Sequence, residues 1–484
     1  PSHSFCGTAF RKVEPTGSPP NLHGGNVRKT PLALASIAAA ALALTVIPAQ
    51  AADNPGLVPT SSWNSGQKEI TIGLEAPMTG IFAVLGISQQ NSLQVVADQI
   101  NAKGGIGGAQ IKIKALDDAL SPVKAVANAK EFAADKTIPF VVGPSITAYY
   151  QAAVSSYEDN KKVNCQPAVG AGDFTNYKYG FRSQDYYKDT INAMLSILQH
   201  KKVSSLGLIY ESGATGQDFN DYLTKVAGQY GIAYIGWQQI SPSATSHNDQ
   251  VQKFIDADAI WISNNAYGAL TAKAAKALNY KGQVVGGSGS QNIAFHEAGG
   301  KDFAGELMAA PNYQYPVRDK SKWLPGYKAH IDAIVAKYGE NVGATSGAKS
   351  PKGTAIAADC LYAFAVAANK VQSFDPDKVA AAMATLDIPA DQTPSGNRIH
   401  PGPEHNFYQQ DAIHVYEWNV DANGWFVNEV TKDVAKIAEV TQAVAAAPKA
   451  AAKAGDACTK SGAKVKSGSK TLTCTKVKGK LVLK

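Results

Sequence analysis

Two glycine-rich segments come closest to the spacing of known catalytic or phosphate-binding motifs. Residues 104–108 (GGIGG) suggest a phosphate loop, but no Lys-Ser/Thr pair follows, and they come after an expected helix, where a dinucleotide fingerprint would follow a strand. Residues 286–290 (GGSGS) approach a nucleophile elbow, but Ser290 stands where the last glycine should be. We interpret the first segment as a turn, and neither segment indicates catalysis.

The histidines and cysteines show no spacing typical of a metal or redox centre. His296-Glu297 is followed by Ala-Gly-Gly and so is not H-E-x-x-H, the nine histidines have no metal-ligand spacing, and no C-x-x-C occurs. We therefore predict that the protein is not an enzyme and holds no cofactor and no metal.

Small polar residues follow the ends of several expected strands, where parallel sheets bind their ligands. One strand ends at residues 141–143 (VVG), and residues 144–147 (PSIT) lead into a helix whose first N–H groups attract anions or carbonyl oxygens. Thr147 is therefore either a ligand contact or the N-cap of this helix. Tyr149 is either a ligand contact or an aromatic side chain packed on the helix.

Strand and helix patterns alternate along most of the chain, which predicts parallel sheets with right-handed crossovers. A first series has strands near residues 70, 111, 140 and 163. A second series has helices at residues 188–200, 217–230 and 266–278 and strands at residues 206–210, 233–237, 259–263 and 283–286. Each series has enough βα units to close a core of its own, so we predict two lobes.

Three helices and a hairpin are expected after the second series. The helices lie at residues 324–338, 354–371 and 377–386. Alternating residues 412–418, the turn Asn423-Gly424 and residues 425–430 predict the β-hairpin.

Four motifs together resemble one known family. They are M-T-G-x-x-A-x-x-G at residues 78–86, I-N-A-K-G-G-I-x-G at residues 100–108, Asp117-Asp118, and V-V-G-P-S at residues 141–145. The chain resembles the branched-chain amino-acid and amide/urea solute-binding proteins of ABC importers over residues 70–430. This resemblance implies a type I periplasmic-binding fold, α/β, with two Rossmann-like lobes joined by a hinge. Residues 68–181 and 311–405 would form the first lobe, and residues 182–310 and 406–430 the second.

The resemblance also implies a set of ligand contacts. In the first lobe, the positions that hold a ligand carboxylate align with Thr147, Ala148, Ala168, Val169 and Gly170. Phe82 and Leu85 lie where the family has an aromatic contact, and Tyr149 is a further candidate. The second lobe would contribute Thr215, Asn265 and Ser288.

Three aligned positions depart from the amino-acid binders. Ser288 stands where they carry the carboxylate that pairs with the ligand ammonium, Gly170 stands where they carry a hydroxyl, and they carry an aromatic residue near Leu85. The aligned pocket is therefore expected to be more neutral and less aromatic than theirs. A buried ammonium without a counter-charge is costly, so these changes favour an amide, urea-like or other small polar solute over leucine, isoleucine or valine. Asp185 is an alternative counter-charge, but we favour a charge at the hinge surface. The sequence does not identify the solute.

The net charge of +7 is concentrated at one end of the chain. Residues 441–484 hold ten lysines and one aspartate, whereas the rest holds 36 basic and 38 acidic residues. The body is therefore nearly neutral, and nothing in it indicates nucleic-acid binding.

The N-terminal region has the pattern of an export signal. Arg28-Lys29, an apolar run at residues 32–47 and Ala49-Gln50-Ala51 predict a signal peptide over residues 27–51, and a membrane anchor is the less favoured alternative. Residues 1–26, rich in Pro and Gly, are expected to be absent from the mature protein. No cysteine follows the apolar run, so we predict export to the periplasm or envelope exterior without a lipid anchor.

The cysteines fall into two groups in the exported chain. For Cys165 and Cys360 we favour two buried thiols over a bridge. Cys458 and Cys474 are predicted to form a disulfide that closes a small β module at residues 456–484, after an Ala/Lys-rich linker at residues 431–455. The lysines of this module would hold the protein near an anionic envelope, or simply keep it soluble.

These observations predict a monomeric solute-binding protein that captures a small-molecule solute between two lobes and delivers it to an ABC transporter permease. The alternatives are a ligand-sensing receptor ectodomain and a secreted, non-catalytic binding protein. A receptor would need a membrane span after the lobes, and residues 430–484 contain no such apolar run.

Overall fold

The computed structural model describes residues 62–167, 174, 176–241, 244–263, 267–291, 296, 304–312, 317–339, 351–430, 461, 464–467, 470–477 and 480–483. The predicted signal peptide, residues 1–26, the linker at residues 431–455 and Cys458 lie outside these residues. Among the described residues, no helix combines the length and apolar character needed to cross a membrane.

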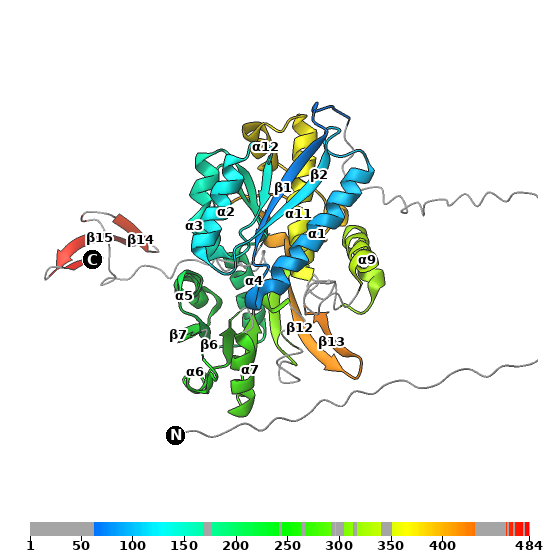
Figure 1. Cartoon of the computed structure of the whole chain (residues 1–484). Helices are drawn as coiled ribbons and strands as arrows, with labels where there is room; N and C mark the ends of the chain where they lie inside the picture. The colour runs from blue at the N-terminus through cyan, green and yellow to red at the C-terminus, as the bar shows by residue number, and fades with distance from the viewer. Residues whose placement is uncertain are drawn as a thin grey trace, which may run out of the picture. The chain divides into compact units, whose positions relative to one another are not determined.

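The first lobe is built on a six-stranded sheet in the order β11-β5-β4-β3-β1-β2 (Figure 1). All of its strand pairs are parallel. Its strands are β1 (Glu69–Ala76), β2 (Gln110–Asp117), β3 (Phe140–Val142), β4 (Val163–Gln166), β5 (Gly180–Asp185) and β11 (Asn406–Tyr408).

Helices cover both faces of this sheet. On one face α1 (Ala83–Ala102) and α11 (Pro351–Val371) share a large apolar core with alternate strand residues such as Ile72 and Phe140. On the other face lie α2 (Pro122–Ala134) and α3 (Thr147–Asp159). The remaining helices that return to this lobe are α9 (Pro325–Tyr338) and α12 (Pro376–Met383).

Local sequence explains where two of these helices begin. Ser121 caps α2, because its side chain accepts a hydrogen bond from the Lys124 N–H, and Pro122 occupies the first helical turn. Asp375 does the same for α12 by accepting from the Lys378 N–H. These short side chains satisfy N–H groups that the helix itself leaves unpaired.

The second lobe has a seven-stranded sheet in the order β13-β12-β10-β9-β8-β6-β7. Its strands are β6 (Ser205–Glu211), β7 (Ala233–Ile240), β8 (Ala259–Ile262), β9 (Gln283–Gly286), β10 (Leu307–Pro311), β12 (Ile413–Asp421) and β13 (Gly424–Glu429). One face carries α4 (Tyr187–His200) and α5 (Ala214–Val226), and the other carries α6 (Asn248–Gln252) and α7 (Gly268–Ala277). The two-lobed α/β fold is thus confirmed.

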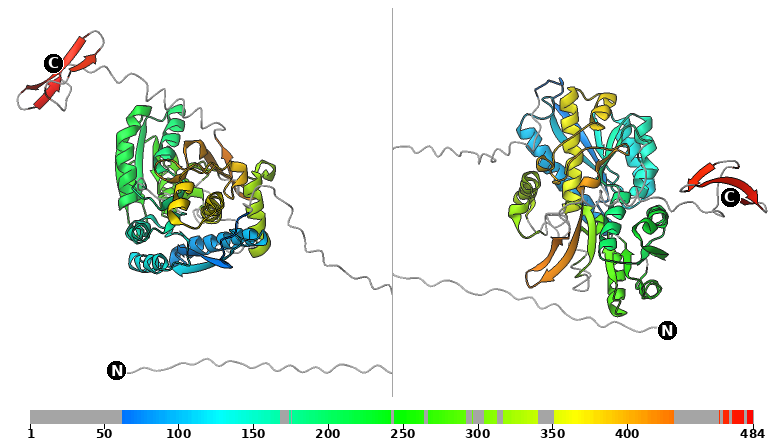
Figure 2. Two further views of the ribbon diagram at one scale, coloured as in Figure 1. Left: turned by 90° about the horizontal axis from the view of Figure 1, so that it is seen from above. Right: turned by 180° about the vertical axis from the view of Figure 1, so that it is seen from behind.

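The predicted hairpin forms and closes one edge of the second sheet (Figure 2). β12 runs antiparallel to both β10 and β13. Gly424 adopts a positive φ of 101°, which glycine tolerates and which the tight turn after Asn423 requires.

The lobe boundaries differ from the prediction most at the first and the last of the three crossings between lobes. We expected these two crossings after residue 181 and after residue 405. Instead β5 continues to Asp185, and Asn406 pairs with Arg182, so β11 belongs to the first sheet. The second sheet resumes only at Ile413. β11 is only three residues long and, unlike the continuous apolar run of β3, begins with a polar residue, which is why it escaped detection.

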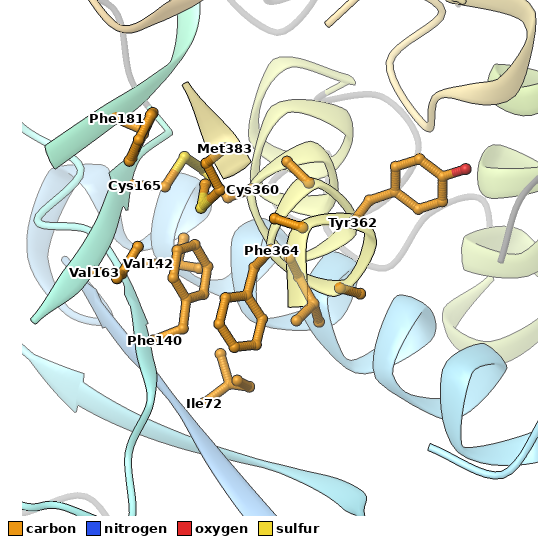
Figure 3. Close-up of a cluster of buried hydrophobic side chains, with 14 of the residues drawn as sticks. Ile72, Phe140, Val142, Val163, Cys165, Phe181, Cys360, Tyr362, Phe364 and Met383 are labelled. Carbon is orange, nitrogen blue, oxygen red and sulfur yellow. A yellow bond between two sulfur atoms is a disulfide. The ribbon is translucent and has the colours of Figure 1, made fainter. Parts of the chain in front are cut away.

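A disulfide links the first sheet to the returning helix. Cys165 of β4 and Cys360 of α11 are both fully buried, 195 residues apart in sequence, with Cα atoms 5.7 Å apart. The prediction of two free buried thiols was wrong. Figure 3 shows the bond within the core, near Phe140 and Phe364, whose rings stack with centroids 4.6 Å apart.

The C-terminal residues form a separate three-stranded antiparallel sheet of β14 (Lys464–Ser467), β15 (Lys470–Val477) and β16 (Lys480–Leu483). The predicted β module therefore exists. Cys474 is buried in β15 and is disulfide-bonded. Its pairing with Cys458 stays a prediction, because Cys458 lies outside the described residues.

Removing the Cys165–Cys360 disulfide should destabilise the protein. We expect a double variant, Cys165→Ala and Cys360→Ala, to lose about 2–5 kcal/mol of unfolding free energy, because the bridge closes a long loop in the unfolded chain. Denaturant titration would measure this. Reduced wild-type protein is the control, because it lacks the bond but keeps the volume of both side chains. Equal denaturation midpoints for oxidised, reduced and variant protein would contradict the prediction.

Candidate functional site

A cavity of about 340 Å³ lies at the carboxyl ends of strands from both sheets. This is where open parallel α/β sheets bind ligands. Its walls are formed by the loop after β1, the start of α3, the end of β4, the loop after β6 and Ile356 of α11. Its lining residues are Phe82, Leu85, Ser145, Ile146, Thr147, Ala148, Gln151, Pro167, Tyr210, Glu211, Ser212, Gly213, Ala214, Thr215, Gly216 and Ile356.

Five of the predicted contact residues meet at this cavity, namely Phe82, Leu85, Thr147, Ala148 and Thr215. Tyr149 and Ser288 do not line it. The other predicted contacts lie outside the described residues and remain predictions: Ala168, Val169, Gly170 and Asn265.

The alternatives for Thr147 and Tyr149 resolve differently. Ile146, not Thr147, is the N-cap of α3, and the Thr147 hydroxyl instead accepts a hydrogen bond of 3.4 Å from the Gln166 amide. The Tyr149 hydroxyl donates to the Leu120 carbonyl at 2.8 Å. Burial raises the pKa of Tyr149, and we interpret it as a packed aromatic side chain.

Gln89 of α1 joins two of the loops that form the cavity wall. Its amide nitrogen donates to the Pro167 carbonyl at 2.8 Å, and its amide oxygen accepts from the Ser145 hydroxyl at 2.5 Å. Gln89 is fully buried, so both bonds are shielded from water. The loops after β3 and β4 are thereby held at a fixed separation.

The cavity contains an acidic residue that the sequence analysis did not identify. Glu211, the last residue of β6, lines it, and its carboxylate accepts a hydrogen bond of 2.7 Å from the Ser263 hydroxyl. Burial raises the pKa of Glu211. The predicted strand stopped one residue earlier, at Tyr210, so the acidic residue at the strand end was overlooked. That strand-end position is the signal that would have identified it.

Ile356 is another lining residue that the sequence did not indicate. It stands near the start of α11, more than 130 residues from its neighbours in the cavity wall, and is 7% exposed. Only the return of α11 to the first lobe brings it there, and no local pattern predicts that contact.

The Asp117-Asp118 motif separates into two different carboxyl groups. Although partly buried, Asp117 has a lowered pKa because it accepts hydrogen bonds from Thr79, Ala119 and Met78. Burial instead raises the pKa of Asp118.

Glu75, at the end of β1, is a buried acid beside this motif. Burial raises its pKa to about 8, opposed by a 2.8 Å hydrogen bond from the Tyr157 hydroxyl and reinforced by the charge of Asp118. Glu75 is fully buried, and we therefore expect it to be largely protonated near neutral pH.

The GGSGS segment has no catalytic geometry. Ser290 donates to one oxygen of Glu306 at 2.9 Å, while His296 contacts the other oxygen at 2.9 Å, so the serine is paired with the acid and not with the histidine. Across the described residues, no group of three or more His, Cys, Asp or Glu side chains is placed to hold a metal ion.

A larger cavity of about 900 Å³ lies elsewhere in the second lobe, lined by residues that precede its strands, including Asp258 and Gln283. These are the amino ends of the strands, where parallel sheets do not bind their ligands. We therefore assign the site to the smaller cavity.

Comparison with known proteins agrees with this geometry. The family model described as "Periplasmic binding protein" matches residues 69–424. A leucine-, isoleucine-, valine-, threonine- and alanine-binding protein of Pseudomonas aeruginosa is 25% identical over 372 residues, which cover 75% of this chain and 93% of that protein. A Leu/Ile/Val-binding protein of Rhizobium johnstonii is 27% identical over 278 residues, 56% of this chain and 73% of that protein.

Solved structures share the fold. A type 1 periplasmic binding protein from Bordetella pertussis superposes with a TM-score of 0.65 at 22% identity, covering 75% of this chain and all of that one. The substrate-binding protein of a branched-chain amino-acid transporter from Streptococcus pneumoniae, in complex with isoleucine, gives 0.61 at 19% identity, with coverages of 75% and 100%.

The buried Glu75 should make stability depend on pH. The pKa of Glu75 is about 8 in the folded protein, against an ordinary value of 4.5, so between these pH values the folded state binds a proton that the unfolded state has lost. The free energy of unfolding therefore falls as pH rises through this range, by at most about 1.4 kcal/mol per pH unit. Glu75→Gln should flatten the curve from pH 5 to 8. Asp118 and Asp359 shift in the same direction, so part of the slope should remain.

Denaturant titrations of wild type and Glu75→Gln at several pH values would measure this difference. Asp135→Asn is a suitable control, because Asp135 has a lowered pKa and its loss should not flatten the curve in this range. Parallel curves for wild type and Glu75→Gln would contradict the assignment.

Proposed function

Because this chain belongs to the periplasmic binding protein family, we propose that it is exported and captures a small amphipathic amino acid in the cavity for an ABC importer. The family consists of solute-binding proteins, not enzymes, so the protein is not an enzyme. Its role is to bind a small solute. The chemical class of that solute is inferred from the residues of the cavity.

The observation that carries the proposal is the carboxylate of Glu211 beside an apolar wall. Phe82, Leu85 and Ile356 line the same cavity as Glu211. A solute with an ammonium group and an aliphatic side chain would satisfy both surfaces, because a charge-assisted hydrogen bond to the carboxylate offsets the desolvation of the ammonium. The relatives in Pseudomonas aeruginosa and Rhizobium johnstonii are named for the binding of such amino acids, which supports this choice.

An amide or urea-like solute is the second candidate. It was favoured by Ser288, which aligns with the carboxylate of the amino-acid binders, but Ser288 is 2% exposed and does not line the cavity. Glu211 supplies a carboxylate from another strand, β6, and thereby removes the main physical objection to an α-amino acid.

Delivery to the permease and retention near the cell surface complete the proposal. Ligand contacts from both lobes would favour their closed arrangement, which the permease would recognise on a monomeric binding protein. The lysine-rich C-terminal module would add a salt-sensitive attraction to an anionic envelope.

Calorimetry with leucine, isoleucine, valine, acetamide and urea tests the solute class. We expect leucine or a similar amino acid to bind, and Glu211→Gln to weaken that binding roughly 10- to 100-fold, as for a lost charge-assisted hydrogen bond. Ser288→Ala is the matched control and should leave the affinity unchanged. Binding of acetamide or urea in preference to all three amino acids would contradict the proposal.

A further inference from the structure

One buried side chain connects the two loops of the first lobe in which the aligned carboxylate contacts lie. These loops follow β3 and β4, and the aligned positions in them are residues 147–148 and 168–170. Gln89 of α1 accepts a hydrogen bond from the Ser145 hydroxyl at 2.5 Å and donates one to the Pro167 carbonyl at 2.8 Å. Both partners of Gln89 are therefore within two residues of an aligned contact.

The Pro167 carbonyl fixes the direction of both hydrogen bonds. A carbonyl oxygen only accepts, so the amide nitrogen of Gln89 faces Pro167 and its amide oxygen faces Ser145. Ser145 then gives its hydroxyl proton to Gln89 and has none to give to a solute, although it lines the cavity. A carboxylate accepts hydrogen bonds and donates none, so it gains nothing from this hydroxyl.

Backbone N–H groups must therefore carry more of the contact with a carboxylate. Gly170, which aligns with a hydroxyl residue of the amino-acid binders, has no hydroxyl either. α3 begins at Thr147, and its N-cap, Ile146, has an apolar side chain that makes no capping hydrogen bond. The N–H groups at a helix start attract anions, and their bonds to a carboxylate are about twice as strong as those to a neutral carbonyl.

The placement of backbone donors depends on the placement of their loops. N–H groups from two loops reach one carboxylate only when each lies about 3 Å from one of its oxygens. Gln89 lies one helical turn beyond Leu85, which lines the cavity, so α1 supplies both an apolar wall and the link behind it. A further link between the loops, from the Gln166 amide to the Thr147 hydroxyl, is longer at 3.4 Å. Loops that are held in place before binding lose less conformational entropy when the solute enters.

We propose that Gln89 is a positioning residue that sets the preference of the cavity for a solute with a carboxylate. It holds the loops after β3 and β4 at the separation at which their N–H groups converge on that carboxylate. Gln89 itself does not line the cavity, and so it acts through the loops. This inference rests on the proposed function, because it requires a solute with a carboxylate.

Calorimetry with leucine and leucinamide tests this role, because leucinamide keeps the ammonium and the aliphatic side chain but lacks the carboxylate. We expect wild type to prefer leucine by about tenfold or more. Gln89→Met keeps a similar volume but makes neither hydrogen bond, and it should reduce this preference about fivefold or more, mainly by weakening leucine. A purely structural loss would weaken both ligands alike.

Ser145→Ala separates positioning from direct contact, and it tests the role even if Gln89→Met does not fold. Alone, it should lower the preference for leucine, because one of the two bonds of Gln89 is lost. In the Gln89→Met background it should change the preference by less than about twofold, because the link is already broken. An undiminished effect in that background would show that Ser145 acts on the solute directly, against the proposal.

Asn101 provides a matched control on the same helix. Its amide also bonds a neighbouring segment, by donating to the Ile111 carbonyl at 2.9 Å and accepting from the Ile111 N–H at 2.7 Å, but at the other end of α1. Asn101→Leu should therefore lower the thermal midpoint without changing the preference for leucine over leucinamide. Thermal melting of each variant establishes that it folds.

The outcomes separate this inference from the proposed function. If wild type binds no amino acid, the proposed function fails, and the role of Gln89 fails with it. If wild type binds leucine and leucinamide equally well, or if Gln89→Met weakens both ligands alike, the proposed function stands and Gln89 has only a structural role.

Discussion

The return of α11 to the first sheet is the contact on which the other features depend. α11 lies against α1 and carries Cys360, which is bonded to Cys165 of β4, so the chain is covalently closed after 195 residues. One helical turn before this bond, Ile356 enters the cavity wall. Without α11, one face of the first sheet would lose a helix that covers it, and the cavity would lose the side chain of Ile356.

The same helix also holds the strands that connect the lobes. Asp359, adjacent to Cys360, accepts hydrogen bonds from the Ser395 hydroxyl at 2.5 Å and the Tyr408 hydroxyl at 2.8 Å, and Tyr408 contacts Ser183 at 3.0 Å. Tyr408 and Ser183 belong to β11 and β5, two strands after which the chain passes from the first sheet to the second lobe. Burial raises the pKa of Asp359 to about 7.

Sequence patterns predicted the elements well wherever a helix was long and regular or a turn had a clear signal. The helices expected at residues 324–338 and 354–371 appear as α9 and α11, and the turn at Asn423-Gly424 appears as expected. The failures have physical causes. β11 is three residues long, and the Cys165–Cys360 bond depends on a crossing that no local pattern records. Glu211 was missed because the end of a strand is the least certain part of its pattern.

The site shows the same division between local and long-range information. Thr147 and Thr215 lie in the first turns of the helices that follow β3 and β6, and both line the cavity. Ser288 also follows a strand, β9, yet lies away from the cavity, because alignment places a residue along the chain but not the direction in which the loop turns.

The division of the cavity wall between the lobes accounts for how a solute would bias their closure. The first lobe contributes the apolar side chains of Phe82, Leu85 and Ile356, and the second contributes the acidic side chain of Glu211. A solute that contacts only one of these surfaces would gain the same free energy in either arrangement of the lobes. A solute with an aliphatic group and an ammonium group gains the second contact only when both walls are present, and that difference in free energy is what shifts the equilibrium toward the closed form.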